Sequence, residues 1–171
     1  MCGLPWKRSV TVVMRAFKIP ALERCIALLG VVIVMFGFSG AANAVLGGKV
    51  DSVAADQVQM KASLKVSSTG RFEVHELRTS GGNVVREFVS PEGNVFAVAW
   101  TGHAVPQYSQ LLGSFAQKIT AAAQARHNHR APLVINEPGF VFSAFGHMRF
   151  YSGRAYIPSL VPAGVQVEEI R

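Results

Sequence analysis

Alternating runs of hydrophobic and polar residues predict three strands in the first half of the chain. Runs rich in Val, Phe and Trp cover residues 71–79, 84–90 and 95–101, and turn residues separate them. The second turn reads Pro91-Glu92-Gly93-Asn94, in which proline presets φ and glycine accepts a left-handed conformation. Strands joined by such short turns pair antiparallel. We therefore expect a three-stranded meander. Its third strand is apolar on both faces, so we expect it to be central or covered on both sides.

A helical pattern follows these strands at residues 107–126. Six apolar residues recur there with the spacing of one helix face: Tyr108, Leu111, Leu112, Phe115, Ile119 and Ala122. Pro106 suits the first turn of such a helix, so we expect one amphipathic helix lying across the sheet. A weaker pattern at residues 52–60 predicts a short helix capped by Asp51 or Ser52.

Short strand-like runs return after the helix. They cover residues 132–136, 140–145, 148–151 and 154–157, and Ser152 with Gly153 is expected to form a hairpin turn between the last two. Residues 165–170 add one more short element. Strands, helix and strands in this order, without alternating βα units, predict an α+β fold with an antiparallel sheet.

The N-terminal part of the chain has the three regions of a secretory signal peptide. The uncharged apolar run at residues 25–38 follows five basic residues and precedes small residues that end in Ala42-Asn43-Ala44, an A-x-A cleavage site. We predict a signal peptide at residues 1–44, cleavage before Val45, and a single exported, periplasmic domain at residues 45–171. Met14 is an alternative start that shortens the basic region.

An uncleaved anchor is the alternative to cleavage. Residues 25–46 are nearly apolar, and about 20 apolar residues suffice to span a bilayer. In that case the protein is a membrane-anchored domain, and only then does the sequence predict a membrane partner.

Removing the signal peptide changes the charge and the cysteine content. The chain has 17 Lys and Arg against 10 Asp and Glu, a net charge of +7. Residues 1–44 hold five of these basic residues and one acidic residue, which leaves 12 − 9 = +3 for residues 45–171. The basic excess therefore belongs largely to the targeting segment, and we expect no nucleic-acid partner. Cys2 and Cys25 also lie in that segment, which excludes disulfides and thiol chemistry from the exported domain.

Three blocks of the sequence resemble a known family. They are VREFVSPEGNVFAVAW at residues 85–100, LLG at residues 111–113 and GHMRFYSGRAYIPSLVPAGV at residues 146–165. Together they resemble the exported bacterial family catalogued as domain of unknown function 2844. The resemblance implies export and a single domain, and it implies no reaction and no catalytic residues.

The residues of the exported domain argue against an enzymatic activity. A serine hydrolase needs a nucleophile, a base and a carboxylate, yet the only aspartates are Asp51 and Asp56, and no G-x-S-x-G is present. Nothing in the local sequence indicates a raised pKa for any of the candidate glutamates, Glu73, Glu76, Glu87, Glu92 and Glu137. We therefore expect a non-enzymatic protein without a cofactor.

Two histidines define an alternative hypothesis. His127 and His129 lie in a polar connector and offer imidazole ligands for Zn, Cu or Ni, although a metal site needs further ligands. This hypothesis makes the chain a histidine-dependent metal-binding protein or hydrolase. The competing interpretation is a polar loop after a helix, where basic residues complement the helix dipole.

The stretch GHMRFYSGRAYIP at residues 146–158 is the candidate binding patch. Its polar and aromatic members are His147, Arg149, Tyr151, Arg154 and Tyr156. Guanidinium groups suit carboxylates and phosphates, and tyrosines are frequent at interfaces. One interpretation is a recognition patch for an envelope protein or an anionic polymer, in an exported binding or accessory domain. In the other, the arginines pair with glutamates of the meander and the aromatic residues complete the core.

Overall fold

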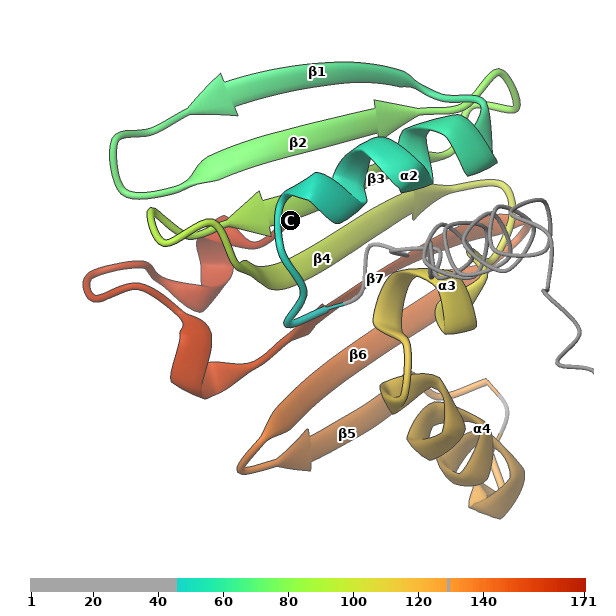
Figure 1. Ribbon diagram of the computed structural model, residues 1–171. Helices are drawn as coiled ribbons and strands as arrows, with labels where there is room; N and C mark the ends of the chain where they lie inside the picture. The colour runs from blue at the N-terminus through green and yellow to red at the C-terminus, as the bar shows by residue number, and fades with distance from the viewer. Residues whose placement is uncertain (1–45, 129) are drawn as a thin grey trace, which may run out of the picture. The chain divides into compact units, whose positions relative to one another are not determined.

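An antiparallel sheet of seven strands forms the centre of the part that the structure describes, residues 46–128 and 130–171 of a computed structural model (Figure 1). Its strands, in chain order, are β1 (Ser63–Ser68), β2 (Glu73–Arg78), β3 (Val84–Val89), β4 (Val95–Gly102), β5 (Leu133–Glu137), β6 (Phe140–His147) and β7 (Phe150–Tyr156). Across the sheet the order is β1-β2-β3-β4-β7-β6-β5, and every neighbouring pair is antiparallel. This confirms the α+β class with an antiparallel sheet. The predicted signal peptide lies outside the described residues, as does His129.

The strands differ from the prediction in three places. β1 was not predicted and makes the first antiparallel run four strands long. The two short strands expected at residues 148–157 are one strand, β7, so Ser152 and Gly153 lie within a strand. The turn between β6 and β7 is formed by Met148 and Arg149 instead.

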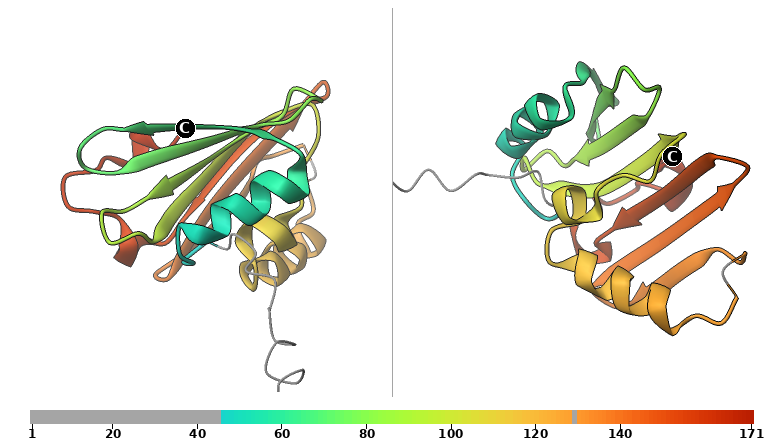
Figure 2. Two further views of the ribbon diagram at one scale, coloured as in Figure 1. Left: turned by 45° about the horizontal axis from the view of Figure 1, so that its top comes forward. Right: turned by 90° about the vertical axis from the view of Figure 1, so that its right-hand side faces the viewer.

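Three helices cover one face of the sheet: α2 (Asp51–Met60), α3 (Tyr108–Leu112) and α4 (Phe115–Ala125) (Figures 1 and 2). The single helix predicted at residues 107–126 is therefore wrong, because α3 ends at Gly113, whose φ of 54° and ψ of −124° leave the helical region. The predicted caps of α2 are wrong as well. Its N-cap is Val50, and no side chain caps it.

The sheet buries a hydrophobic core on each face. Under the helices, Leu77, Val85 and Trp100 pack with residues of α3 and α4. On the opposite face, a second cluster of Phe72, Phe88 and Phe96 is covered by residues 158–170, which contain the short 3₁₀ helices η1 (Pro158–Leu160) and η2 (Val167–Glu169) (Figure 2). β4 lies at the middle of the sheet and is buried on both faces, as its sequence predicted.

Arginines attach residues 158–171 to this second face. Arg86 donates to the carbonyl of Arg171 over 3.0 Å, and Arg154 donates to the carbonyl of Val167 over 2.8 Å. Arg71 donates to the carbonyl of Gly164 and forms an ion pair with Glu169 at 2.9 Å. Charge-assisted bonds of this kind orient the segment over the apolar cluster that it covers.

Candidate functional site

The turn between β6 and β7 presents two side chains in a backbone conformation that glycine and asparagine usually adopt. Met148 and Arg149 both have positive φ, 49° and 64°, between the paired residues His147 and Phe150. A two-residue turn with two positive φ values has the type I′ geometry that matches strand twist. Non-glycine residues in this conformation are strained, and Met148 is 87% exposed. These side chains do not serve the packing of the fold, and the strained turn is compatible with a role for them in binding a partner.

The sheet separates the members of the predicted patch. His147 and Arg149 are exposed at the tip of the hairpin. Tyr151 lies on the helix face, where it lines a pocket, whereas Tyr156 packs against the second core on the other face. Arg154 also lies on that other face and donates to carbonyls of residues 167 and 170. The structure thus brings His147, Arg149 and Tyr151 to one end of the hairpin and gives Arg154 and Tyr156 packing contacts elsewhere.

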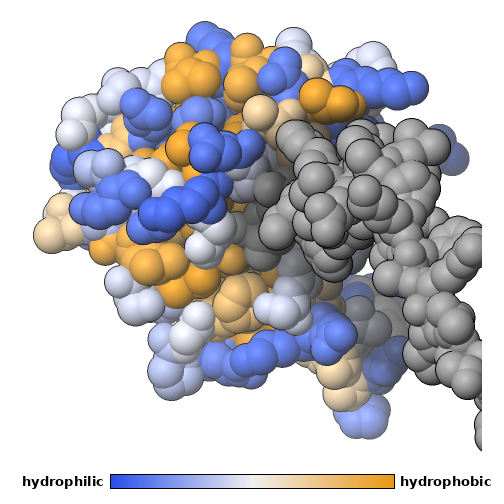
Figure 3. All heavy atoms as spheres, in the orientation of Figure 1, coloured by the Kyte–Doolittle hydropathy of each residue, from blue (hydrophilic) through white to orange (hydrophobic). Residues whose placement is uncertain are grey.

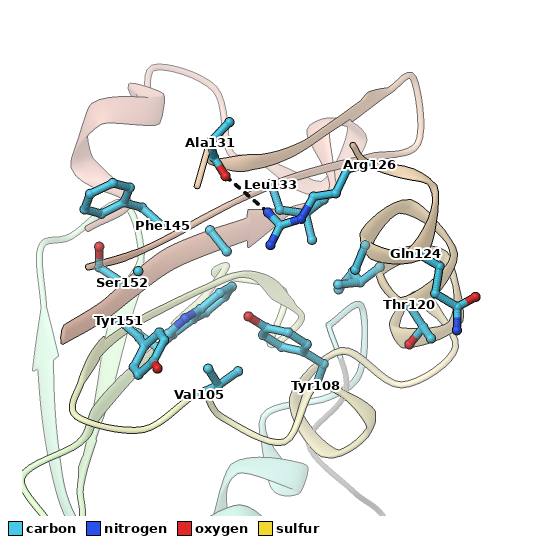
Figure 4. Close-up of a pocket in the computed structure, with 15 residues that line it drawn as sticks. Val105, Tyr108, Thr120, Gln124, Arg126, Ala131, Leu133, Phe145, Tyr151 and Ser152 are labelled. Carbon is cyan, nitrogen blue, oxygen red and sulfur yellow. Dashed lines mark hydrogen bonds between the residues drawn. The ribbon is translucent and has the colours of Figure 1, made fainter. Parts of the chain in front are cut away.

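A pocket of about 590 Å³ lies beside this hairpin, between α4 and the sheet (Figure 4). Two aromatic side chains, Trp100 and Tyr108, line it with their ring centroids 5.5 Å apart. The buried ring of Phe142 packs against both of them at 5.5 to 5.6 Å. Tyr151 and Val105 form the wall on the hairpin side. Volumes of this size, with mostly apolar walls and a few polar groups, are typical of small-molecule sites.

Arg126 supplies the charge of this pocket. Its guanidinium reaches into the pocket from the end of α4 and donates to the carbonyl of Ala131 over 3.1 Å (Figure 4). Among the described residues that line the pocket, it is the one with a charged side chain. Burial raises the pKa of Tyr108, so its hydroxyl stays protonated and able to donate a hydrogen bond. The pocket therefore combines an apolar interior with hydrogen-bond donors from Arg126 and Tyr108.

The charges of the domain are unevenly distributed along the chain. Residues 46–92 contain six basic and six acidic residues. Residues 93–166 contain a single acidic residue, Glu137, which forms an ion pair with Lys118 on α4. The same stretch holds five basic residues: Lys118, Arg126, Arg130, Arg149 and Arg154. The part of the domain that forms the pocket and the hairpin, β4 to β7 with α3 and α4, is consequently basic.

A second cluster of polar groups lies buried under α2. Asp56 of α2 is 0% exposed and accepts a hydrogen bond of 2.8 Å from the side chain of Gln110. Glu87 of β3 is 1% exposed, and burial together with the neighbouring charge of Asp56 raises its pKa to about 9. His75 of β2 is the cross-strand neighbour of Glu87 and is also buried.

The raised pKa of Glu87 corrects the expectation that no glutamate had one. The sequence did contain the signal, because Val85, Glu87 and Val89 alternate and so point to one face of a strand. Since both carboxyl groups are sealed from solvent, a substrate does not reach them in this conformation. We interpret the pair as a buried, shared-proton contact between α2 and the sheet.

The candidate metal ligands do not gather in the described part of the chain. There, no group of three or more His, Cys, Asp or Glu side chains is placed to hold a metal ion. His127 is exposed after α4, and its predicted partner His129 lies outside the described residues. His103 contacts the hairpin, where its Nδ1 lies 3.2 Å from the carbonyl oxygen of Arg149.

The helix-bearing side of the sheet faces the viewer in Figure 3. There, hydrophobic residues reach the surface in several separate groups among hydrophilic ones (Figure 3). None of the helices in the described part of the chain is long and apolar enough to cross a membrane.

Comparison with known proteins identifies one family. The model of a family described as protein of unknown function, DUF2844, matches residues 42–170. No curated protein and no solved structure matches the chain.

Proposed function

The chain belongs to the DUF2844 family, and from this premise we propose that it is an exported, non-enzymatic binding domain for an anionic component of the cell envelope. The single observation that carries the proposal is the charge asymmetry of the domain. One acidic residue against five basic ones in residues 93–166 favours an anionic partner at the end of the molecule that holds the hairpin and the pocket.

Two further observations support a binding role. The hairpin keeps Met148 and Arg149 in a strained turn although their side chains extend toward solvent, which is expected where a side chain serves recognition. The strongly perturbed acidic group of the described residues, Glu87, is sealed in the core, where it contributes to structure and not to a reaction.

The proposal is tested by retention on an immobilised polyanion such as dextran sulfate. The double variant Arg130→Gln/Arg149→Gln removes two exposed charges from the basic half. The matched control Lys61→Gln/Lys65→Gln removes two exposed charges from the balanced half, so the net charge of the two proteins is equal. We expect the first variant to elute at clearly lower salt than the wild type and the control to elute near it. Equal shifts for both would show that only net charge matters and would contradict a binding face.

Arg149→Ala and Arg154→Ala separate binding from folding in the predicted patch. Arg149 is exposed, so we expect its loss to weaken retention without changing the melting temperature. Arg154 bonds carbonyls of residues 167 and 170, so we expect its loss to lower stability by about 1 to 3 kcal/mol. Chemical denaturation measures this difference. An Arg154→Ala variant that keeps its stability but loses retention on the polyanion would show that Arg154 belongs to the binding patch.

Export is tested by the intact mass of the protein isolated from its host's envelope fraction. A mass that corresponds to residues 45–171 would support cleavage before Val45. A chain that keeps residues 25–46 and stays in carbonate-washed membranes would instead make the protein a membrane-anchored domain.

A further inference from the structure

We propose that the pocket between α4 and the sheet binds an amphiphilic monocarboxylate, with its hydrocarbon part against the aromatic interior and its carboxylate on Arg126. This inference rests on the proposed function, because it takes the basic half of the domain as the binding half and names the chemical class of a ligand there.

The interior of the pocket favours hydrocarbon. Trp100 and Tyr108 form its inner part with Phe142 behind them, and Leu133 and Ala144 add aliphatic contacts. Removing hydrocarbon from water is favourable in proportion to the area covered. A cavity of about 590 Å³ is large enough for a drug-sized molecule.

The charge of the pocket favours a single negative group. Arg126 presents a planar fork of donors that matches a carboxylate, and it reaches toward the space into which the hydroxyl of Tyr108 also points (Figure 4). Lys118, also on α4, is not among the residues that line the pocket and forms an ion pair with Glu137. One arginine with neutral donors suits a monoanion, whereas a doubly charged phosphate would call for more cations than the described lining provides.

The pocket contains its own optical reporter. Trp100 is the only tryptophan in residues 45–171, because the other, Trp6, lies in the predicted signal peptide. The emission of the processed protein therefore reports on the pocket alone. In a protein that keeps its N-terminus, Trp6→Phe again makes Trp100 the only tryptophan.

The test is a fluorescence titration of the envelope-isolated protein with dodecanoate, with dodecanol as the uncharged analogue and acetate as the carboxylate without a chain. We expect a saturable change in Trp100 emission with dodecanoate at a stoichiometry near one. We expect binding weaker by about tenfold or more for dodecanol and none for acetate. No saturable change with dodecanoate, or equal affinity for dodecanol, would overturn the proposal.

Two variants with matched controls locate the ligand. Arg126→Gln should weaken dodecanoate binding by about tenfold or more and leave dodecanol binding unchanged, and Lys118→Gln, on the same helix, should change neither. Ala123→Phe fills the pocket from α4 and should abolish binding of both, whereas Ala121→Phe, exposed on the same helix and outside the lining, should not. Wild-type affinity in Ala123→Phe would overturn the proposal even if Arg126→Gln, which also loses its bond to Ala131, proves unstable.

The two proposals fail in different ways. If retention on the polyanion depends on Arg130 and Arg149 but dodecanoate does not bind, the proposed ligand of the pocket is wrong and the proposed anionic partner is still supported. If dodecanoate binds while retention on the polyanion depends on net charge alone, the proposed anionic envelope partner is wrong and the proposed ligand of the pocket is still supported.

Discussion

At the scale of single residues, Glu87 shows how a carboxyl group is accommodated in a hydrophobic core. It lies on the face of β3 that α2 covers, between Val85 and Val89, and the carboxyl group of Asp56 is its charged neighbour. Two buried carboxylates so close cannot both ionise, so one proton is retained at neutral pH. The contact between α2 and the sheet thus depends on a proton.

The stability of the domain should fall as the pH rises. Glu87 binds its proton more tightly in the folded state, with a pKa of about 9, than in the unfolded state, where the ordinary value of 4.5 applies. Its contribution is therefore complete below about pH 4.5 and is lost progressively as the pH approaches 9. We expect the free energy of unfolding in urea to decrease over this range by an amount on the order of a few kcal/mol.

Glu87→Gln should flatten this pH dependence, because the amide stays neutral at every pH. Glu92→Gln is the control, since Glu92 is fully exposed. If the slope persists in Glu87→Gln, Glu87 is not the group whose titration lowers the stability, and this prediction is wrong.

Gly153 is required by contact and not by backbone conformation. A Cβ at this position would come within 2.4 Å of the Trp100 ring and 2.6 Å of the Ser143 carbonyl oxygen. We expect Gly153→Ala to destabilise the fold by about 1 to 3 kcal/mol and to shift Trp100 emission. Gly139→Ala, where the added methyl group meets open space, should be near neutral in the same denaturation experiment.

At the scale of elements, the sequence predicts most of the strands and the turn at residues 91–94, but it misses the break between α3 and α4 and misplaces the turn between β6 and β7. The apolar spacing of residues 108–122 continues across Gly113, so periodicity alone could not show that α3 and α4 are separate helices. Likewise, Ser152-Gly153 has the composition of a turn but lies within β7. Glycine is needed at position 153 because the ring of Trp100 occupies the space that a side chain would take. β1 is absent from the prediction although Leu64 and Val66 alternate with polar residues, because this run holds only two apolar residues and lacks the Val, Phe and Trp content of the other strands.

The hairpin between β6 and β7 should gain stability from the residues that its turn prefers. Met148→Asn/Arg149→Gly places the favoured type I′ pair at the two positions with positive φ. We expect a gain of about 0.5 to 2 kcal/mol in the free energy of unfolding, together with weaker polyanion retention because Arg149 is lost. Unchanged or lower stability would show that the turn is not strained.

At the scale of the whole molecule, the sheet is covered on both faces, and the second cover consists of a segment with little regular structure. Ile170 is fully buried there against the Phe72–Phe88–Phe96 cluster. We expect Ile170→Ala to cost about 2 to 4 kcal/mol, whereas Glu168→Ala, exposed in the same segment, should be near neutral. Thermal denaturation measures both, and equal effects would argue against this packing.

The binding site is less predictable from the sequence than the fold. The pattern at residues 146–158 predicts a turn at Ser152 and Gly153, where the structure has the middle of β7. It does not show that strand alternation sends Tyr151 to one face and Arg154 to the other. The sequence does not indicate Arg126 as a ligand-binding residue, because its place in the pocket depends on the packing of α4 against β5 and β6. Such contacts join residues far apart in the chain, and local patterns do not report them.

Within residues 46–128 and 130–171, β1 and β5 are the outer strands of the sheet, and both disfavour the addition of another strand. β1 is short and polar and carries Lys65, and β5 is flanked by Pro132 and Pro138. Lysines on edge strands and prolines beside them discourage further strands from joining through backbone hydrogen bonds. Growth of the sheet into fibres or chains of copies through these edges is thereby disfavoured, even at high protein concentration. Selectivity for a partner must then come from side chains, which single substitutions can retune without altering the architecture.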